Sequence, residues 1–401
     1  SLPMRAHIQQ LATLAGQPAR RIVGLMSGTS LDGLDVALCH CAGTGNTTRV
    51  VVEQFLTVPY DDAFKTAIRQ VFAKRAVDFQ HLTLLNVVVA ERHAAIVLDC
   101  LRQWNIPPEE VDLIASHGQT VYHAPRIFHD LADYPNATLQ IGDGDHIARR
   151  TGIITISDFR QKHLAAGGEG APLALYGDYF LFSQPGEDRF LLNIGGIANF
   201  TFLPGDSDPA KAFATDTGPG NTLLDAYAQA LFGVPYDADA LLAAAGMIDQ
   251  GLLDLLRREP FFAAPFPKTS GPELFSAAWV ESAIKTLPKG HHNPYNLLAT
   301  LTRLTATTIA ETLLRVPLTA FSPTLYMSGG GAHNPLIWKH LVEKLPGWRL
   351  FPMDVLGIHG DAKEAVLFAV LANETVAGEV NENQKLGGLP LVGLGKISFP
   401  A

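Results

Sequence analysis

Residues 22–38, IVGLMSGTSLDGLDVAL, decide the fold prediction. The stretch begins as an apolar run, breaks into small and hydroxylated residues, and resumes as an alternating apolar run. This pattern predicts two strands joined by a tight turn, in which Gly28 and Gly33 permit positive φ angles. Successive backbone N–H groups in such a turn form an anion-binding site, for which an ordinary solvated hairpin is the alternative. The hydroxyls beside these N–H groups belong to Ser27, Thr29 and Ser30.

Two carboxylates, Asp32 and Asp35, stand beside this predicted anion site. A carboxylate repels a phosphate unless a cation lies between them. Magnesium is bound in proteins by one or two carboxylates together with phosphate oxygens. Asp32 therefore predicts a magnesium ion at the turn.

The composition limits the classes of function. With 401 residues, two domains are expected, and 47% hydrophobic residues supply sizeable cores. A net charge of −9 argues against nonspecific binding of nucleic acid and against an anionic membrane surface. Three cysteines give no disulfide framework, and no apolar run is long enough to span a membrane, so a cytoplasmic protein is expected.

The pattern of the opening stretch returns in the second half of the chain. An apolar run at 190–194 is interrupted by Gly195 and Gly196 and resumes at 197–202. A further strand is expected at 211–216, and the sequence TDTGPGN then leads into a helix. The first N–H groups of a helix lack partners within it, so this approach suits an anion or its metal ion, with simple capping as the alternative.

A third glycine-rich loop, SGGGAHNP at 328–335, follows a short buried strand. Three glycines at a strand-to-helix turn let a flat ring or a phosphate lie against the backbone. The spacing fits neither the dinucleotide fingerprint nor a Walker A loop. Two α/β halves that each open with a glycine hairpin, followed by a late glycine loop, predict two ribonuclease H-like lobes of the actin-like ATPase/sugar kinase superfamily, with a central cleft.

Two further clusters carry chemistry. The sequence HGQT at 117–120 directly follows a predicted buried strand at 111–116, where α/β proteins often bind ligands. A capped turn with a satisfied histidine is an equal alternative. The segment 158–173, DFRQKHLAAGGEGAPL, reads as a loop dense in titratable groups and is a candidate active site. A flexible interdomain linker is the alternative.

Taken together, the motifs resemble the anhydro-N-acetylmuramic acid kinase family. They are GLMSGTSLDGLDVAL, SHGQTVYH, LQIGD, SDFR, AAGGEGAPL, NIGGIANF, TDTGPGN, a K-S-G-E-F series from Lys268 to Phe275, and SGGGAHNPL. The resemblance runs in order from about residue 22 to about residue 372. It implies an ATP- and Mg²⁺-dependent reaction in which water opens a 1,6-anhydro sugar while O6 receives the γ-phosphoryl group. The product is N-acetylmuramic acid 6-phosphate.

The resemblance also implies roles for residues at matching positions. Contacts with ATP are implied for Gly28, Thr29, Ser30, Leu31, Asp32, Gly33, Leu34, Asp35, Gly195, Gly196, Gly218, Gly220, Asn221, Gly329, Gly330 and Gly331. Contacts with the sugar are implied for His117, Gln119, Arg160 and Glu364. Asp32 and Asp216 are the candidate magnesium ligands, and a homodimer without a nucleic-acid partner is expected.

One departure from the family pattern concerns the catalytic base. Where the family is expected to read Phe-Arg-x-x-Asp-x-Ala, this chain has His163 in place of the aspartate, and Glu169 stands in place of a glutamine. Either side chain is a candidate base, with His163 preferred because its ordinary pKa lies near neutrality, and Asp158 is an outside candidate. His163 as a plain sugar contact is the competing interpretation. Loss of the water-activating step is the remaining alternative.

The sequence therefore leaves more than one class of function open. The main hypothesis is the anhydro-sugar kinase, and the alternatives are a kinase for a different anhydro sugar and an ATP-binding pseudokinase or regulator. A sugar-cleaving enzyme that does not use ATP is a further, weaker alternative. The expected lobes are 1–158 and 159–379, and the tail 380–401 is a candidate addition to the first lobe.

Overall fold

The structure is a computed structural model that describes residues 3–170, 173–270, 273–288, 293–320, 322–379 and 383–401. Ala171, Pro172 and Gly271 of the sequence motifs, and the first residues of the expected C-terminal tail, lie outside these ranges. The chain divides into two compact units, residues 1–182 with 358–401 and residues 183–357. Within the described ranges, no helix has the length and apolar character that a membrane span needs.

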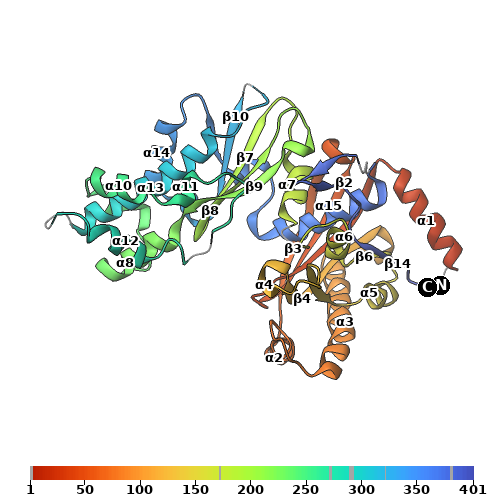
Figure 1. The fold of residues 1–401 in the computed structure, drawn as a ribbon. Helices are drawn as coiled ribbons and strands as arrows, with labels where there is room; N and C mark the ends of the chain where they lie inside the picture. The colour runs from red at the N-terminus through yellow and green to blue at the C-terminus, as the bar shows by residue number, and fades with distance from the viewer. Residues whose placement is uncertain (1–2, 171–172, 271–272, 289–292, 321, 380–382) are drawn as a thin grey trace. The chain divides into compact units, whose positions relative to one another are not determined.

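The first unit is built on a seven-stranded sheet with the order β14-β6-β4-β1-β2-β3, and β5 pairs with β4 (Figure 1). β1 is antiparallel to β2 and parallel to β4, which is parallel to β6. The strands are β1 (Ala19–Ser27), β2 (Gly33–Ala42), β3 (Arg49–Pro59), β4 (Leu113–Ala124), β5 (Ala137–Ile141), β6 (Thr155–Ser157) and β14 (Lys396–Ser398). A separate two-stranded ribbon joins β12 (Lys385–Leu386) and β13 (Leu389–Pro390).

The second unit is built on a five-stranded sheet with the order β11-β10-β7-β8-β9. β7 is antiparallel to β8 and parallel to β10, and β10 is parallel to β11. The strands are β7 (Asp188–Ile194), β8 (Ile197–Leu203), β9 (Phe213–Pro219), β10 (Pro323–Ser328) and β11 (Arg349–Pro352).

The two sheets share one topology. In each, the first three strands form an antiparallel meander, and two further strands add in parallel beside the first, which gives the order 3-2-1-4-5 of a ribonuclease H-like sheet. The α/β fold and the repeated glycine hairpin are thus confirmed. In the first hairpin Ser27 pairs with Leu34, and in the second Ile194 pairs with Ala198, so each glycine turn joins the first two strands of its sheet.

Helices cover both sheets. Those of the first unit are α1 (Met4–Gly16), α2 (Asp62–Arg69), α3 (Phe79–Gln103), α4 (Arg126–His129), α5 (Gly144–Thr151), α6 (Phe159–Ala165), α7 (Ala174–Phe182) and α15 (Lys363–Ala377). Those of the second are α8 (Asn221–Phe232), α9 (Leu241–Ala244), α10 (Gln250–Leu256), α11 (Pro260–Ala263), α12 (Ala277–Ile284), α13 (Pro294–Leu314) and α14 (Pro335–Lys344). α13 packs against α8, α9, α10 and α14 and against β8 and β9, and most of its residues are buried.

The unit boundaries differ from those expected from the sequence. Residues 159–182 and 358–379 belong to the first unit, because α15 packs directly on β1 and α7 packs on α15. The packing against β1 is close at Gly24, where a Cβ atom would lie 2.0 Å from the carbonyl oxygen of Ala365. The described part of the C-terminal tail also joins the first unit, since β14 pairs with β6.

Two expectations about local structure are wrong. Residues 117–120 lie inside β4 and not after it, because β4 still pairs with β1 at Gln119 and from there on pairs with β5. Residues 159–165, expected as part of a loop, form α6. Short polar helices of this kind carry little apolar periodicity, so their sequence resembles that of a loop.

Candidate active site

The first glycine turn is residues 28–32, between β1 and β2. Leu31 adopts the left-handed conformation, with φ of 59°, and its N–H donates to the carbonyl of Gly28 at 3.2 Å. Neither Gly28 nor Gly33 has a positive φ angle, so that expectation is corrected. The Leu31 side chain is buried among the apolar residues of the first core, and this packing holds the strained backbone in place.

The side chains of this turn divide into two groups. Those of Thr29, Ser30 and Asp32 are exposed and accessible to a ligand. Ser27 is buried, and its hydroxyl donates to Gln119 Oε1 and accepts from Tyr60 Oη, so it is not available to an anion. Leu34 is a core residue of β2.

Asp35 differs from Asp32 in its surroundings. It is half-buried in β2 and accepts a hydrogen bond from Thr57 Oγ1 at 2.6 Å. Burial raises the pKa of Asp35 and outweighs the effect of this hydrogen bond. Asp32 is thus the more accessible of the two carboxylates for a cation.

The second glycine turn, at Gly195 and Gly196, is fixed by the start of α8. The N–H of Asn221 donates to the Gly195 carbonyl at 2.7 Å, and those of Gly220 and Thr222 donate to the Gly196 carbonyl at 3.0 and 3.3 Å. These N–H groups are therefore engaged, which corrects the expectation that they are left for an anion. They instead hold the carbonyls of the turn toward the helix.

The third glycine loop lies beside this turn within the second unit. Asn221 Nδ2 donates to the Ile194 carbonyl at 2.9 Å, and a Cβ atom on Gly329 would lie 2.6 Å from that same carbonyl. A Cβ atom on Gly330 would lie 3.1 Å from Asn221 Nδ2, and Gly331 is buried beside Ile194. The second unit thus brings Gly195, Gly196, Gly220, Asn221 and the 329–331 loop together.

A cavity of about 490 Å³ opens beside this cluster. Its walls include Asn221 and Gly330, the exposed ring of Tyr236, and the carboxyl group of Asp225. Burial raises the pKa of Asp225. The cavity combines a ring face, carboxyl groups and glycine backbone, a mixture of apolar surface and placed polar groups that is typical of small-molecule sites.

Asp216 is held at one oxygen. On β9, its Oδ2 accepts from the backbone N–H of Ser270 at 2.7 Å and from the Ser270 hydroxyl at 3.3 Å. The backbone N–H of Asp216 in turn donates to the carbonyl of Lys268 at 3.0 Å. The half-buried carboxylate is therefore fixed, and no hydrogen bond is seen at its Oδ1 among the described residues. Gly218, two residues further along β9, is buried opposite Ala198.

In the first unit, Arg160 is held from two sides. Its Nε donates to His117 Nε2 at 2.9 Å, and its Nη1 donates to the carbonyl of Gly170 at 2.8 Å. Burial, together with the Arg160 charge, lowers the pKa of His117 to about 3, so the imidazole is neutral and accepts this hydrogen bond. His117 and Gln119 are both buried and bonded to protein groups, so their side chains act on the site through Arg160 and the turn.

Arg160 lines a cavity of about 320 Å³ with Glu364 at the start of α15. The same cavity is lined by Lys363 and Asp178, which form an ion pair at 3.0 Å. The Glu364 charge favours the protonated form of Arg160, although burial lowers the pKa of this guanidinium overall. The structure thus joins Arg160 and Glu364, which the sequence predicted, with Lys363, which it did not single out.

His163 is buried in α6 beneath the glycine loop. Its Nδ1 accepts the N–H of Gly170 at 3.0 Å, and its ring packs edge-on against Tyr176. Burial and the neighbouring Arg160 lower the pKa of His163. A neutral imidazole that accepts at Nδ1 carries its hydrogen on Nε2 and has no lone pair left for a proton. This geometry argues against His163 as the base and favours a role in anchoring the loop.

The other two candidates for the base are also weakened. Asp158, with φ of 55°, forms an ion pair with Lys396 at 2.6 Å, which matches a structural role. Glu169 is exposed on the loop, and burial and the Arg160 charge lower the pKa of the nearby His123 even though the Glu169 charge opposes this shift. No local pattern in the sequence points to Tyr60 or Ser270, since each acts on a residue more than 30 positions away in the chain. Within the described ranges, no three His, Cys, Asp or Glu side chains gather as a metal site.

Comparisons with known proteins agree with the motifs. A family model described as anhydro-N-acetylmuramic acid kinase matches residues 20–398. The chain is 50% identical to the protein of that name from Pseudoalteromonas atlantica, over 99% of this chain and 100% of the relative. It is 36% identical to that from Caldanaerobacter subterraneus subsp. tengcongensis, over 98% and 100%. Among solved structures, one match is an activator of 2-hydroxyisocaproyl-CoA dehydratase from Clostridium difficile, with a TM-score of 0.38 and 11% sequence identity. The alignment covers 89% of this chain and 95% of the activator chain.

Proposed function

The chain belongs to the anhydro-N-acetylmuramic acid kinase family, and from this premise we propose its reaction. The protein uses ATP to phosphorylate O6 of anhydro-N-acetylmuramic acid while water opens the 1,6-anhydro ring, which yields N-acetylmuramic acid 6-phosphate. The observation that carries this proposal is the family match from residue 20 to residue 398, which spans all three glycine turns.

The nucleotide contacts follow from the two glycine hairpins and the late glycine loop. In the first unit, the exposed Thr29 and Ser30 side chains and the backbone of the turn are proposed to bind phosphate. In the second unit, the fixed Gly195–Gly196 turn is proposed to bind phosphate as well. The cavity lined by Tyr236, Asp225 and Gly330 is proposed to bind the nucleoside.

Phosphoryl transfer from ATP is expected to require Mg²⁺, which neutralises charge on the phosphates when it is bound. Asp32 suits it, because its carboxylate is exposed beside the first turn, and carboxylate oxygens are the ligands that Mg²⁺ prefers. The sequence also suggested Asp216 as a magnesium ligand, but its contacts suit it better to the role of general base.

We assign the general base to Asp216 in place of His163. A base needs a fixed position and an accessible lone pair on the accepting atom. Asp216 meets both conditions, since Ser270 fixes Oδ2 and Oδ1 has no hydrogen bond among the described residues. In this role Asp216 accepts a proton from a water molecule at Oδ1.

His163 offers a test of this reassignment. An asparagine places its Oδ1 close to the position of the imidazole Nδ1, so His163→Asn keeps the acceptor for the Gly170 N–H but has no basic group. We expect kcat of this variant to stay within about threefold of wild type, since general-base catalysis contributes about a hundredfold or more. Steady-state kinetics with His163→Ala as the comparison measure this. A loss of about a hundredfold in both variants would return the role of base to His163.

On the sugar side, Arg160 and Glu364 are proposed to contact the substrate. The lactyl group of anhydro-N-acetylmuramic acid carries a carboxylate, and Arg160 and Lys363 are both half-buried cations of the first-unit cavity. Lys363 is paired with Asp178, whereas the hydrogen bonds of Arg160 go to a neutral imidazole and a carbonyl, so Arg160 is the proposed partner of this carboxylate. Glu364 is exposed on the same cavity, where it suits sugar hydroxyls.

Arg160→Gln is accordingly expected to raise KM for the sugar by about tenfold, the usual effect of losing one charge-assisted hydrogen bond. The same change should leave KM for the lactyl-free 1,6-anhydro-N-acetylglucosamine nearly unaltered if that sugar is turned over. Arg160→Lys, which keeps the charge, is the matched control. Equal losses with both sugars would place the lactyl carboxylate elsewhere.

The proposed reaction is tested by incubating the purified protein with Mg-ATP and anhydro-N-acetylmuramic acid, with ADP release and sugar mass both recorded. A product heavier by one phosphate group and one water supports the kinase. Binding of ATP without ADP release or a changed sugar would favour a different anhydro sugar and then the pseudokinase. A homodimer and a cytoplasmic location remain predictions, of which light scattering tests the first.

A further inference from the structure

A chain of buried polar side chains leads from α3 to the first glycine turn. His93 Nε2 lies 2.8 Å from Tyr60 Oη, and Tyr60 Oη lies 2.8 Å from Ser27 Oγ. Ser27 Oγ bonds to Gln119 Oε1, and Gln119 Nε2 reaches the carbonyl oxygen of Gly28 at 3.4 Å. The four side chains come from four separate segments and are at most 5% exposed.

The direction of these hydrogen bonds is fixed. Burial lowers the pKa of His93 to about 3 and raises that of Tyr60, so both groups are neutral. Tyr60 has one hydrogen, which it donates to Ser27, and therefore it accepts the hydrogen of His93 Nε2. Ser27 donates its hydrogen to Gln119 Oε1. The carboxamide must then direct its NH₂ group toward the Gly28 carbonyl and toward that of Thr120, at 3.2 Å.

The chain of hydrogen bonds thus ends on the backbone of the turn. The Gly28 carbonyl accepts from Gln119 and also from the N–H of Leu31. In a trans peptide the carbonyl and the following N–H point in opposite directions. Holding the Gly28 carbonyl inward therefore directs the N–H of Thr29 away from Gln119. The backbone N–H of Tyr60 also donates to the Asp32 carbonyl at 3.1 Å, which fixes the far end of the same turn.

From this geometry we propose that His93, Tyr60, Ser27 and Gln119 are positioning residues for nucleotide binding. They hold the Gly28–Thr29 peptide so that its N–H is presented to a phosphate of the nucleotide, and they do not touch the phosphate themselves. This inference rests on the proposed kinase function, since it assigns the turn to ATP. Burying these polar side chains in an apolar core costs desolvation free energy that their hydrogen bonds only partly offset. Packing alone therefore does not account for them, whereas a role in holding the turn does.

The direct test is Tyr60→Phe, which removes the hydroxyl and keeps the ring contact with Phe64. We expect Kd and KM for Mg-ATP to rise about tenfold, as the loss of one buried hydrogen bond allows, and KM for the sugar to stay unchanged. Tyr326→Phe is the matched control, because Tyr326 is also 5% exposed and its hydroxyl bonds to Glu187 at 2.9 Å in the second unit. Kd is measured by equilibrium dialysis with labelled ATP, which requires no turnover.

A second pair of variants separates positioning from general stability. His93→Gln keeps an N–H group for Tyr60, whereas His93→Phe removes it. His93 Nδ1 has no hydrogen-bond partner in the part of the chain that the structure describes. The glutamine oxygen that replaces it therefore loses no hydrogen bond. Affinity for ATP should therefore be nearer to wild type in His93→Gln than in His93→Phe, at similar melting temperatures.

The outcomes distinguish this inference from the proposed function. If wild type binds ATP but phosphorylates no anhydro sugar, the reaction is wrong, and dialysis still tests the positioning role. If Tyr60→Phe binds ATP as tightly as Tyr326→Phe does, the positioning role is overturned. A rise in KM for the sugar alone would overturn it as well.

Discussion

Asp216→Asn is expected to lower kcat by about a thousandfold, the middle of the range for loss of a general base. Asparagine has the same shape as aspartate and can still accept from the Ser270 N–H and hydroxyl, so the local structure should be preserved. It cannot take a proton from water at neutral pH. The rate is measured by mass spectrometry of the phosphorylated sugar under saturating conditions.

The same variant separates the two roles considered for Asp216. If it is the base, KM for ATP and the Mg²⁺ concentration for half-maximal rate should change little. If it is a magnesium ligand, the Mg²⁺ requirement should rise several-fold. Asp206→Asn, an exposed substitution in the same unit, serves as the control with unchanged kinetics. A kcat within tenfold of wild type in Asp216→Asn would refute the assignment of the base.

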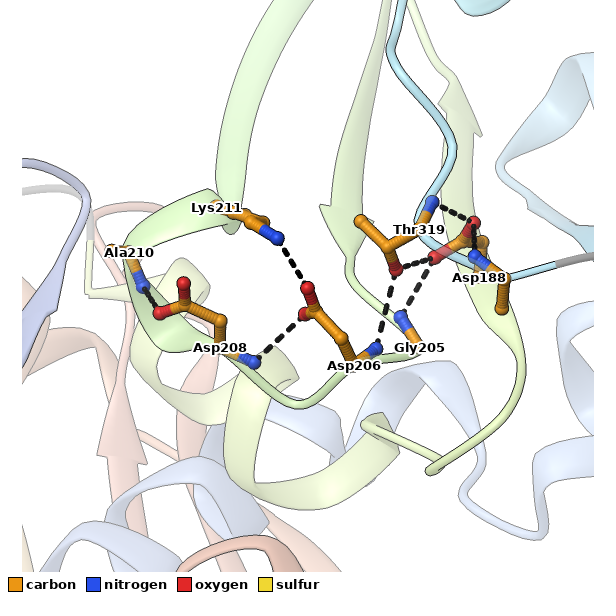
Figure 2. A network of polar contacts seen from close by, with 8 residues as sticks. Asp188, Gly205, Asp206, Asp208, Ala210, Lys211 and Thr319 are labelled. Carbon is orange, nitrogen blue, oxygen red and sulfur yellow. Dashed lines mark hydrogen bonds and ion pairs between the residues drawn. The ribbon is translucent and has the colours of Figure 1, made fainter.

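The largest expected effect on stability is at Asp188. Its side chain is fully buried and accepts from the backbone N–H group of Ala320 at 2.8 Å. It also accepts from the backbone N–H groups of Gly205 and Thr319, both at 2.7 Å (Figure 2). The hydroxyl of Thr319 donates to it at 2.6 Å. The carboxylate thus ties the start of β7 to the connection before β10 and to the turn after β8. Asp188→Asn places an NH₂ group against N–H donors, which leaves hydrogen bonds unmade inside the fold.

We expect Asp188→Asn to lower the free energy of unfolding of the second unit by about 3 kcal/mol, because the hydrogen bonds lost are to a buried charge. Trp348 packs on Phe190 of the same sheet, with ring centroids 4.8 Å apart, so tryptophan fluorescence in urea reports the unfolding. Asp208→Asn is the control. Asp208 accepts from the N–H of Ala210 and so caps the following turn (Figure 2). Asparagine caps a turn about as well as aspartate does. A difference below 0.5 kcal/mol between the two variants, about the size of an ordinary surface effect, would contradict this expectation.

The two halves of the fold were predictable because their signals are local. Alternating apolar residues on both sides of a glycine turn specify a hairpin, and the two hairpins at residues 22–38 and 190–202 were found in this way. The short helix α6 was missed, since its residues carry no clear period. The extension of β4 through 117–120 was missed because it depends on pairing with β1 and β5, which no local pattern reveals.

The sequence by itself determined the family, the paired hairpins and the positions of the three glycine turns. These follow from residue order and spacing, which a motif preserves without reference to distant partners. Only the tertiary structure decided what each side chain does at its position. It engages Nδ1 of His163 with the Gly170 N–H, fixes Asp216 through Ser270, and connects Tyr60 to the first turn through Ser27. Such roles depend on which atom of a side chain is already hydrogen-bonded, and that is set by partners far away in the chain.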